Sequence, residues 1–198
     1  MAWGKLGTTT LGASSTEVNV ESLEDKKFHT VIRHWTKDTT RRVTFLFNDD
    51  ATTYAGRWSD NGGSDSTETV SIGYPQGFNG VDTTPHFNIE YVINIASEEK
   101  LAMGWLVAQN TAGASNAPAR QEYVGKHDDT TNPISQHNLQ LGVVSGNGEF
   151  LTDSNVSVLG SDVTPAAAVP PTVIDGSIFY ETDTNKEYVL YNSTWTEV

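Results

Sequence analysis

Cysteine is absent from the 198-residue chain. Without thiols, the sequence excludes a disulfide framework, a thiolate zinc site and a cysteine nucleophile. Long apolar runs are also missing, since no window approaches the roughly 18 apolar residues that a membrane-spanning helix needs. The first residues, MAWGKLGTTTLG, contain no continuous apolar segment of the kind found in a secretory signal peptide. We therefore expect no membrane partner.

Positive charge is scarce. The chain has 12 Lys and Arg residues against 25 Asp and Glu residues, for a formal net charge of −13. A surface this acidic repels the phosphate backbone of nucleic acids, so we expect no nucleic-acid partner. It also favours solubility, which is the ordinary consequence of a solvated acidic surface.

Helical periodicity is almost missing. The best helical candidate, residues 20–27 (VESLEDKK), is too short to form a stable helix and suits a turn equally well. Strand-like alternation is frequent instead. The clearest run, HFNIEYVINI, places Phe87, Ile89, Tyr91, Ile93 and Ile95 on one face. Further alternating runs occupy residues 27–35, 42–47, 101–109, 139–144 and 155–160.

Clusters of Asn, Asp, Gly and Pro separate these runs, as expected for turns between strands. About eight to ten strands joined by such turns predict an all-β fold, an antiparallel β-sandwich of jelly-roll-like form. Alternation, in place of continuous apolar runs, argues against a parallel sheet covered by helices. We assign this domain to residues 1–160.

The composition changes after residue 160. Residues 161–176 are rich in Pro and Ala and predict an extended linker. Residues 177–198 predict a small C-terminal β-meander of three strands, too small to be stable unless it packs on another surface. Its aromatic side chains are the predicted assembly contacts: Phe179, Tyr188, Tyr191 and Trp195.

No catalytic motif is present, so we expect a protein that is not an enzyme and that has no cofactor. His127, Asp128 and Asp129 suit a divalent metal only if other ligands converge, and a solvated turn explains them more simply. Four Asp residues near position 50 match no calcium loop. Glu90 and Glu98 resemble a glycosidase pair no more than other acidic pairs do. We predict no metal site.

Aromatic side chains in or beside loops offer a ligand site, because flat rings stack on sugar faces. The candidate contacts for a glycan are Tyr54, Trp58, Tyr74 and Phe78. An alternative is that Tyr54 and Trp58, four residues apart on one strand, both face the core. Arg57 would then point away and pair with Asp49 or Asp60.

Two segments resemble structural proteins of tailed phages, particularly marine ones. The first is FNDDATTYAGRWSDNGG, whose matching residues are Phe47, Asn48, Asp50, Tyr54, Arg57, Ser59, Asn61, Gly62 and Gly63. The second is similar to a short terminal module of phage virion proteins, and its matching residues are Gly176, Phe179, Thr182, Asp183, Thr184, Tyr188 and Trp195. The resemblance covers about a fifth of the chain and implies a virion structural protein without naming catalytic residues.

The leading hypothesis is therefore a non-enzymatic capsid decoration or cement protein, located in the virion and acting as a homo-oligomer. Its partners would be other virion proteins, either the major capsid protein or tail components. The alternative hypothesis is a tail- or fibre-associated module, or a carbohydrate-binding jelly roll, that contacts host glycans. An extracellular enzyme is the third hypothesis.

Overall fold

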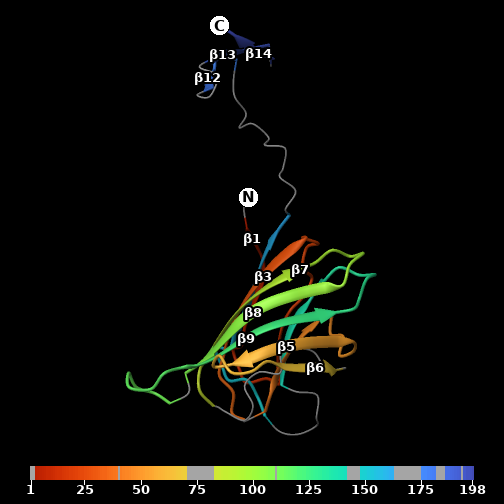
Figure 1. The fold of residues 1–198 in the computed structure, drawn as a ribbon, viewed down its shortest axis with the longest axis vertical. Coiled ribbons are helices and arrows are strands. Elements are labelled where there is room, and N and C mark those ends of the chain that lie inside the picture. Colours follow the sequence, from red (N-terminus) through yellow and green to blue (C-terminus); the bar gives the residue numbers. More distant parts are fainter. Residues whose placement is uncertain are drawn as a thin grey trace. The chain divides into compact units, whose positions relative to one another are not determined.

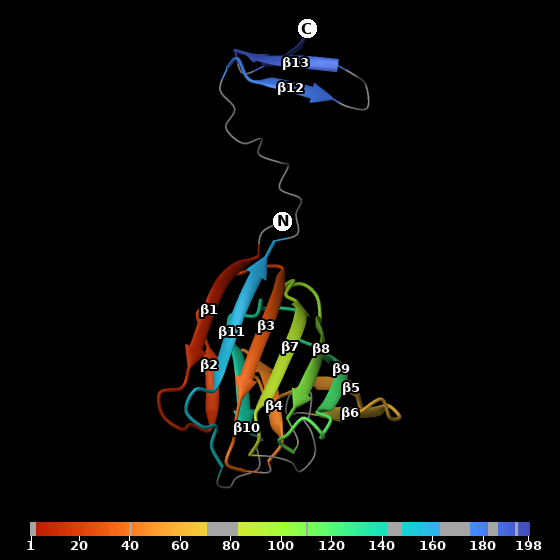
Figure 2. The same ribbon diagram turned by 90° about the vertical axis from the view of Figure 1, so that its left-hand side faces the viewer.

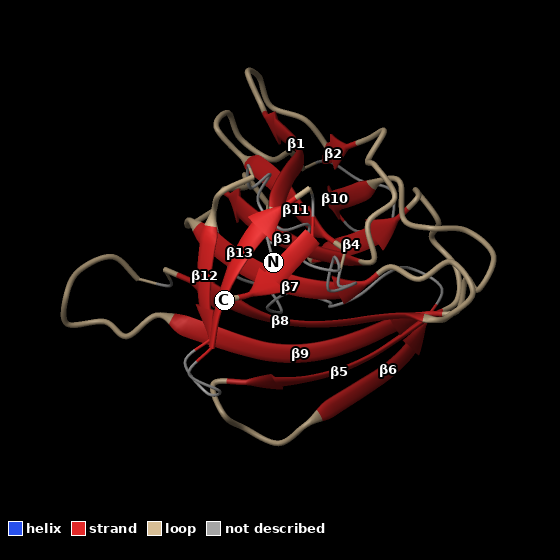
Figure 3. Cartoon of the chain, turned by 90° about the horizontal axis from the view of Figure 1, so that it is seen from above, coloured by secondary structure: helices blue, strands red, loops and turns tan. Residues whose placement is uncertain are grey.

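The computed structural model describes residues 3–39, 41–70, 83–109, 111–141, 148–162, 175–181, 186–192 and 194–198. Every regular element within these ranges is a β-strand (Figure 3). No helix in the described part of the chain is long and apolar enough to cross a membrane. The chain divides into two compact units, Met1–Val163 and Thr164–Val198. The limits drawn from composition, after residues 160 and 176, stay predictions because most of the linker lies outside the described ranges.

The first unit is built on a large sheet of eight strands, drawn in Figure 1. In chain order they are β1 (Gly4–Thr10), β3 (Phe28–Trp35), β5 (Tyr54–Asp60), β6 (Ser66–Val70), β7 (His86–Ile93), β8 (Lys100–Ala108), β9 (Ala119–His127) and β11 (Asn155–Ser161). Their order across the sheet is β1-β11-β3-β7-β8-β9-β5-β6. All neighbours pair antiparallel.

A second sheet of three strands covers one side of the large sheet. Its strands are β2 (Glu17–Val20), β10 (His137–Leu141) and β4 (Val43–Phe47), with β10 in the centre. Figure 2 shows β10 and β4 behind the large sheet. The structure is thus an antiparallel β-sandwich with a small C-terminal meander, as the sequence predicts. The jelly-roll-like form stays a prediction.

The core lies between the two sheets. Every residue of β4 is buried, because this short strand is covered on both of its faces. Trp35 of β3 meets Phe45 of β4 edge to face, with ring centroids 6.1 Å apart. Phe45 also contacts Tyr123 of β9, so one ring of the small sheet joins two strands of the large one. Burial of such rings is the main source of stability in a sandwich core.

Alternation in β7 and β8 is as regular as the sequence predicts, but the apolar side faces outward. In β8, buried and exposed residues alternate, starting with Lys100, which is buried, and Leu101, which is exposed. In β7, His86, Asn88 and Glu90 are buried, whereas Phe87 and Tyr91 are exposed. The side of these strands that faces the small sheet is therefore the more polar one.

The second unit contains β12 (Ile178–Glu181), β13 (Lys186–Tyr191) and β14 (Thr194–Glu197), which form an antiparallel meander. On one face, the ring of Phe179 lies 6.2 Å from that of Tyr188 and 6.1 Å from that of Trp195. Lys186 and Glu197 close the same face with an ion pair of 2.8 Å. The second unit is thus the three-stranded meander that the sequence predicts.

Candidate functional site

The segment from Phe47 to Gly63 is a strand, a turn, a second strand and a glycine turn. Asn48 and Asp49 adopt positive φ angles of 55° and 56°, which Asn and Asp tolerate better than most residues. The Asn48 side-chain oxygen accepts hydrogen bonds from the backbone N–H groups of Ser135 and Gln136, at 2.8 and 3.2 Å. Asn48 therefore fixes the loop before β10 to the end of β4, which is a structural role.

Tyr54 is buried, with 2 % of its surface exposed. The backbone N–H of Phe47 donates to its hydroxyl oxygen at 2.8 Å, and its ring stacks on His127 at 4.4 Å. Burial raises the pKa of the Tyr54 hydroxyl. Its ring is covered by protein, so it offers no face to a sugar, in agreement with the alternative that placed it in the core.

The other predicted ligand contacts have different outcomes. Trp58 is partly buried and packs against the core, as the same alternative predicts for it. Arg57 pairs with Asp65 at 3.1 Å, so the expected pairing with Asp49 or Asp60 is wrong. Asp65 directly precedes β6, and β6 pairs with β5, which carries Arg57. The local sequence did not indicate that Asp65 would lie beside Arg57. Tyr74 and Phe78 lie outside the described residues.

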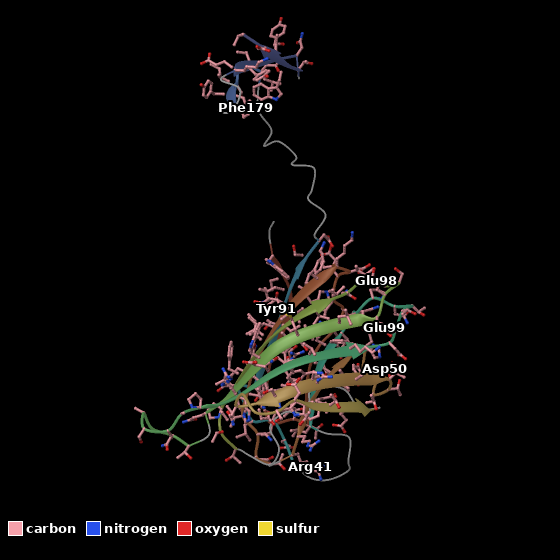
Figure 4. The ribbon with its side chains drawn as sticks, viewed as in Figure 1. Arg41, Asp50, Tyr91, Glu98, Glu99 and Phe179 are labelled. Atoms are coloured by element: carbon pink, nitrogen blue, oxygen red, sulfur yellow. The ribbon has the colours of Figure 1, made fainter. Side chains whose placement is uncertain are left out.

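Several of the carboxylates that suggested a metal site have protein partners. Asp50 accepts from the Nε2 of His127 at 3.1 Å and from both the backbone and the hydroxyl of Thr52. Asp129 accepts from the backbone N–H groups of Thr131 and Asn132, which closes a turn. In Figure 4, Asp50 lies at the same end of the large sheet as Glu98 and Glu99. The described residues contain no cluster of three or more His, Cys, Asp or Glu side chains arranged to hold a metal.

A buried polar network lies between the sheets, and sequence reasoning missed it. Arg33 forms an ion pair of 2.7 Å with Glu90 and donates to the side-chain oxygen of Asn88 at 2.8 Å. Asn88 donates in turn to the hydroxyl of Tyr123 at 2.9 Å. The Arg33 guanidinium lies 3.9 Å from the centre of the Phe45 ring, a cation–π contact. Arg33 and Glu90 are fully buried, so Glu90 cannot meet a soluble substrate.

Lys100 is also buried. Its ammonium group forms hydrogen bonds with backbone carbonyl oxygens instead of water. It donates to the carbonyls of Ile95, Glu98 and Asp129 at 2.9, 2.7 and 2.7 Å. Burial lowers the pKa of Lys100, and nearby carboxylates oppose that effect. The lysine thereby joins the turn after β7 to the loop after β9. Lys100 follows Glu98 and Glu99 in the sequence and resembles a surface charge, so no local signal predicts its burial.

The exposed apolar side chains gather on the side of the large sheet that faces away from the small sheet. We call this surface the outer apolar face, and it consists of Phe87, Tyr91, Leu101, Met103, Trp105, Val107 and Val124. The seven side chains are 38–49 % exposed and come from β7, β8 and β9. An exposed apolar surface of this kind can bind another apolar surface.

Hollows lie along the same face. One of about 250 Å³ is lined by Trp105, Arg57 and Glu122, among others. Another of about 270 Å³ is lined by Trp3, Tyr91 and further apolar side chains. No family model, curated protein or solved structure matches the chain.

Proposed function

We propose that this protein is a non-enzymatic phage structural protein that decorates the capsid surface as a homo-oligomer. The resemblance of residues 47–63 and 176–195 to segments of phage virion proteins supports the assignment. The observation that carries the docking role is the second unit, which exposes large apolar side chains on both faces of its sheet. Surface patches of this kind mark interaction sites in soluble proteins.

The pairing of the strands shows how the two faces differ. Phe179, Tyr188 and Trp195 lie on one face and contact one another. Tyr191 is 68 % exposed and Ile178 is 71 % exposed, and both lie on the opposite face. A sheet of three short strands cannot bury apolar side chains on two sides by itself. The second unit is thus suited to insertion against a neighbouring protein of the particle.

The test compares the full chain with a variant that ends at residue 163, using capsids from which the protein has been removed. Co-sedimentation should show strong binding of the full chain and loss of occupancy for the truncated variant. A full-length variant with Ile178→Ser and Tyr191→Ser should also lose occupancy, because these exposed side chains would meet the partner. Thr194→Ser, at an exposed polar position of the same meander, is the matched control. Normal binding by the truncated variant would refute the docking role.

A second candidate function is a tail- or fibre-associated module that binds host glycans. The observation in its favour is the hollow of about 250 Å³ that combines Trp105 with Arg57, Asp65 and Glu122. A half-exposed ring beside polar groups suits stacking on a sugar. A glycan-array signal that disappears in Trp105→Ala but persists in Tyr191→Ser would support this function, whereas no signal for the intact protein would reject it.

A further inference from the structure

We propose that the outer apolar face is the contact surface of a homodimer in which the large sheets of two copies pack face to face. The inference rests on the proposed function in one respect, namely that the protein acts as a homo-oligomer. It adds the surface responsible and the symmetry of the contact. A twofold dimer uses the same patch on both copies, so the patch must complement itself.

The first argument is the distribution of side chains over the two sides of β7 and β8. The outward positions, from Phe87 to Ile93 and from Leu101 to Val107, are all apolar. Several inward positions hold ionisable or amide groups, including Asn88, Glu90 and Lys100. A sheet with one solvated side normally has the reverse arrangement. The outward side therefore has the composition of a surface that is covered.

The second argument is area. An aromatic side chain can bury about 150–250 Å². The outer apolar face, with seven large side chains that are each 38–49 % exposed, therefore offers on the order of 600 Å². A stable interface of standard size buries about 800 Å² on each partner. Half-buried neighbours such as Ile32 and Ile89 extend the face, so a second copy would cover an area of the right size.

The third argument is charge. Copies with a net charge of −13 repel each other at long range, so a contact surface with little net charge of its own avoids adding to that repulsion. Beside the outer apolar face, the charges on β5 and β9 occur as pairs of opposite sign on the same copy. These pairs are Arg57–Asp65, Arg120–Glu122 and Lys126–Glu99. These three pairs make the charge of β5 and β9 beside the face locally balanced.

The shape of the face agrees with this packing. The hollow of about 270 Å³ between Trp3, Phe28, Tyr91 and Leu101 is lined almost entirely by apolar groups. It can receive a protruding side chain of the other copy. Two sheets that pack face to face lie about 10 Å apart and interlock their side chains, as the layers of a sandwich do. The dimer would form a second sandwich layer on the exposed side of the large sheet.

Sedimentation velocity of the full chain in particle-free buffer tests the proposal. At about 1–100 µM, where dimers of moderate affinity form, the protein should sediment as a dimer of a 21.5 kDa chain. Met103→Glu and Val124→Glu should each weaken dimerisation at least about tenfold, because each buries two unpaired carboxylates in the contact. Ser14→Glu, at an exposed position of the loop between β1 and β2, is the matched control and should leave the dimer intact. Circular dichroism melting should show that all variants fold.

Three results would overturn the inference. One is a wild-type protein that stays monomeric at the highest concentration, whether or not it binds a glycan through Trp105. Another is a dimer that Met103→Glu and Val124→Glu do not weaken although both variants are folded. The last is a dimer that disappears when residues 164–198 are removed, since self-association would then depend on the second unit. Particle binding is measured separately, so its loss would refute the proposed function without affecting this result.

Discussion

Single polar side chains hold together parts of the sandwich that lie far apart in the sequence. His29 of β3 and His137 of β10 connect the two sheets through a hydrogen bond of 2.9 Å between Nδ1 and Nε2. Arg33 and Glu90 join β3 to β7 through their ion pair. Such groups are costly to bury unless each has a partner, so loss of one partner is expected to be strongly destabilising.

The histidine pair makes stability depend on pH. Burial lowers the pKa of His29 from 6.5 to about 4 and places that of His137 well below its ordinary value, with the charges of His29 and Arg33 adding to the effect on His137. Between pH 6.5 and 4, these histidines therefore bind protons in the unfolded chain but stay neutral in the folded chain. Stability should be complete above pH 6.5 and fall as the pH drops through that window. For His29 alone, the loss is about 3 kcal/mol.

Urea unfolding at several pH values between 7.5 and 4 measures this dependence. A His29→Leu, His137→Phe double variant should show a much flatter profile, because both proton-binding sites are gone. His34→Gln, at an exposed position of the same strand, should keep the wild-type slope. The partly exposed carboxylates Asp50 and Asp129 titrate at lower pH, since the pKa of each is lowered from 3.8. A wild-type midpoint that does not change with pH in this window would contradict the assignment.

Lys100→Met should destabilise the protein by about 3 kcal/mol or more, because it leaves buried carbonyl oxygens without a donor. Lys126→Met is the control, since Lys126 faces Leu101 across the β8–β9 ladder but is exposed. Its surface ion pair with Glu99 is worth at most about 1 kcal/mol. Thermal melting of both variants measures the difference. Equal destabilisation would show that the buried Lys100 ammonium stabilises the fold no more than a surface lysine does.

At the scale of strands, the sequence predicts well which segments form strands, but it predicts poorly which strands lie side by side. The runs that became β3, β4, β7, β8, β10 and β11 alternate clearly, and all of them are strands in the structure. The strands β1 and β9 were not expected, because GKLGTTT is rich in Thr and Gly, and Arg120, Glu122 and Lys126 fill outward positions of β9. A period of two assigns side chains to two faces, but it does not say which face meets the small sheet.

The same limit applies to the candidate site. Tyr54 and Trp58 stand out in the sequence as aromatic residues near loops, yet both pack against the core. The outward direction of Tyr91 and Trp105 depends on where the small sheet lies, which is a long-range property. The partner of Arg33 likewise follows from the register of β3 against β7, in which Arg33 faces Asn88. The residues next to Arg33 in the sequence do not predict that pairing.

One glycine of β8 allows two strands and a tyrosine to approach closely. A Cβ atom at Gly104 would lie 2.5 Å from the Tyr123 hydroxyl and 2.6 Å from the carbonyl oxygen of Ile89. Gly104→Ala should therefore destabilise the sandwich by about 1–3 kcal/mol through overpacking. Gly4→Ala is the matched strand control, because nothing lies within 4 Å of its Cβ position. Urea midpoints measure both, and a neutral Gly104→Ala would show that β8 can shift without cost.

At the scale of the whole molecule, the chain combines a strongly negative net charge with two separate exposed apolar surfaces. The net charge of −13 keeps copies apart at long range, whereas the outer apolar face and the second unit favour contact at short range. The two surfaces belong to different compact units. The proposed dimer contact and the proposed docking surface thus lie on different compact units.

The balance between these forces predicts how salt affects the proposed dimer. Two copies of charge −13 repel over about 30 Å at 0.01 M ionic strength, and over only about 10 Å at 0.1 M. The apolar contact itself is not screened, so added sodium chloride should tighten the dimer severalfold between about 0.02 and 0.3 M. Sedimentation equilibrium at several salt concentrations measures the change. A dimer that loosens with salt would have to depend on ion pairs between copies, and the apolar sheet face would not be its main contact.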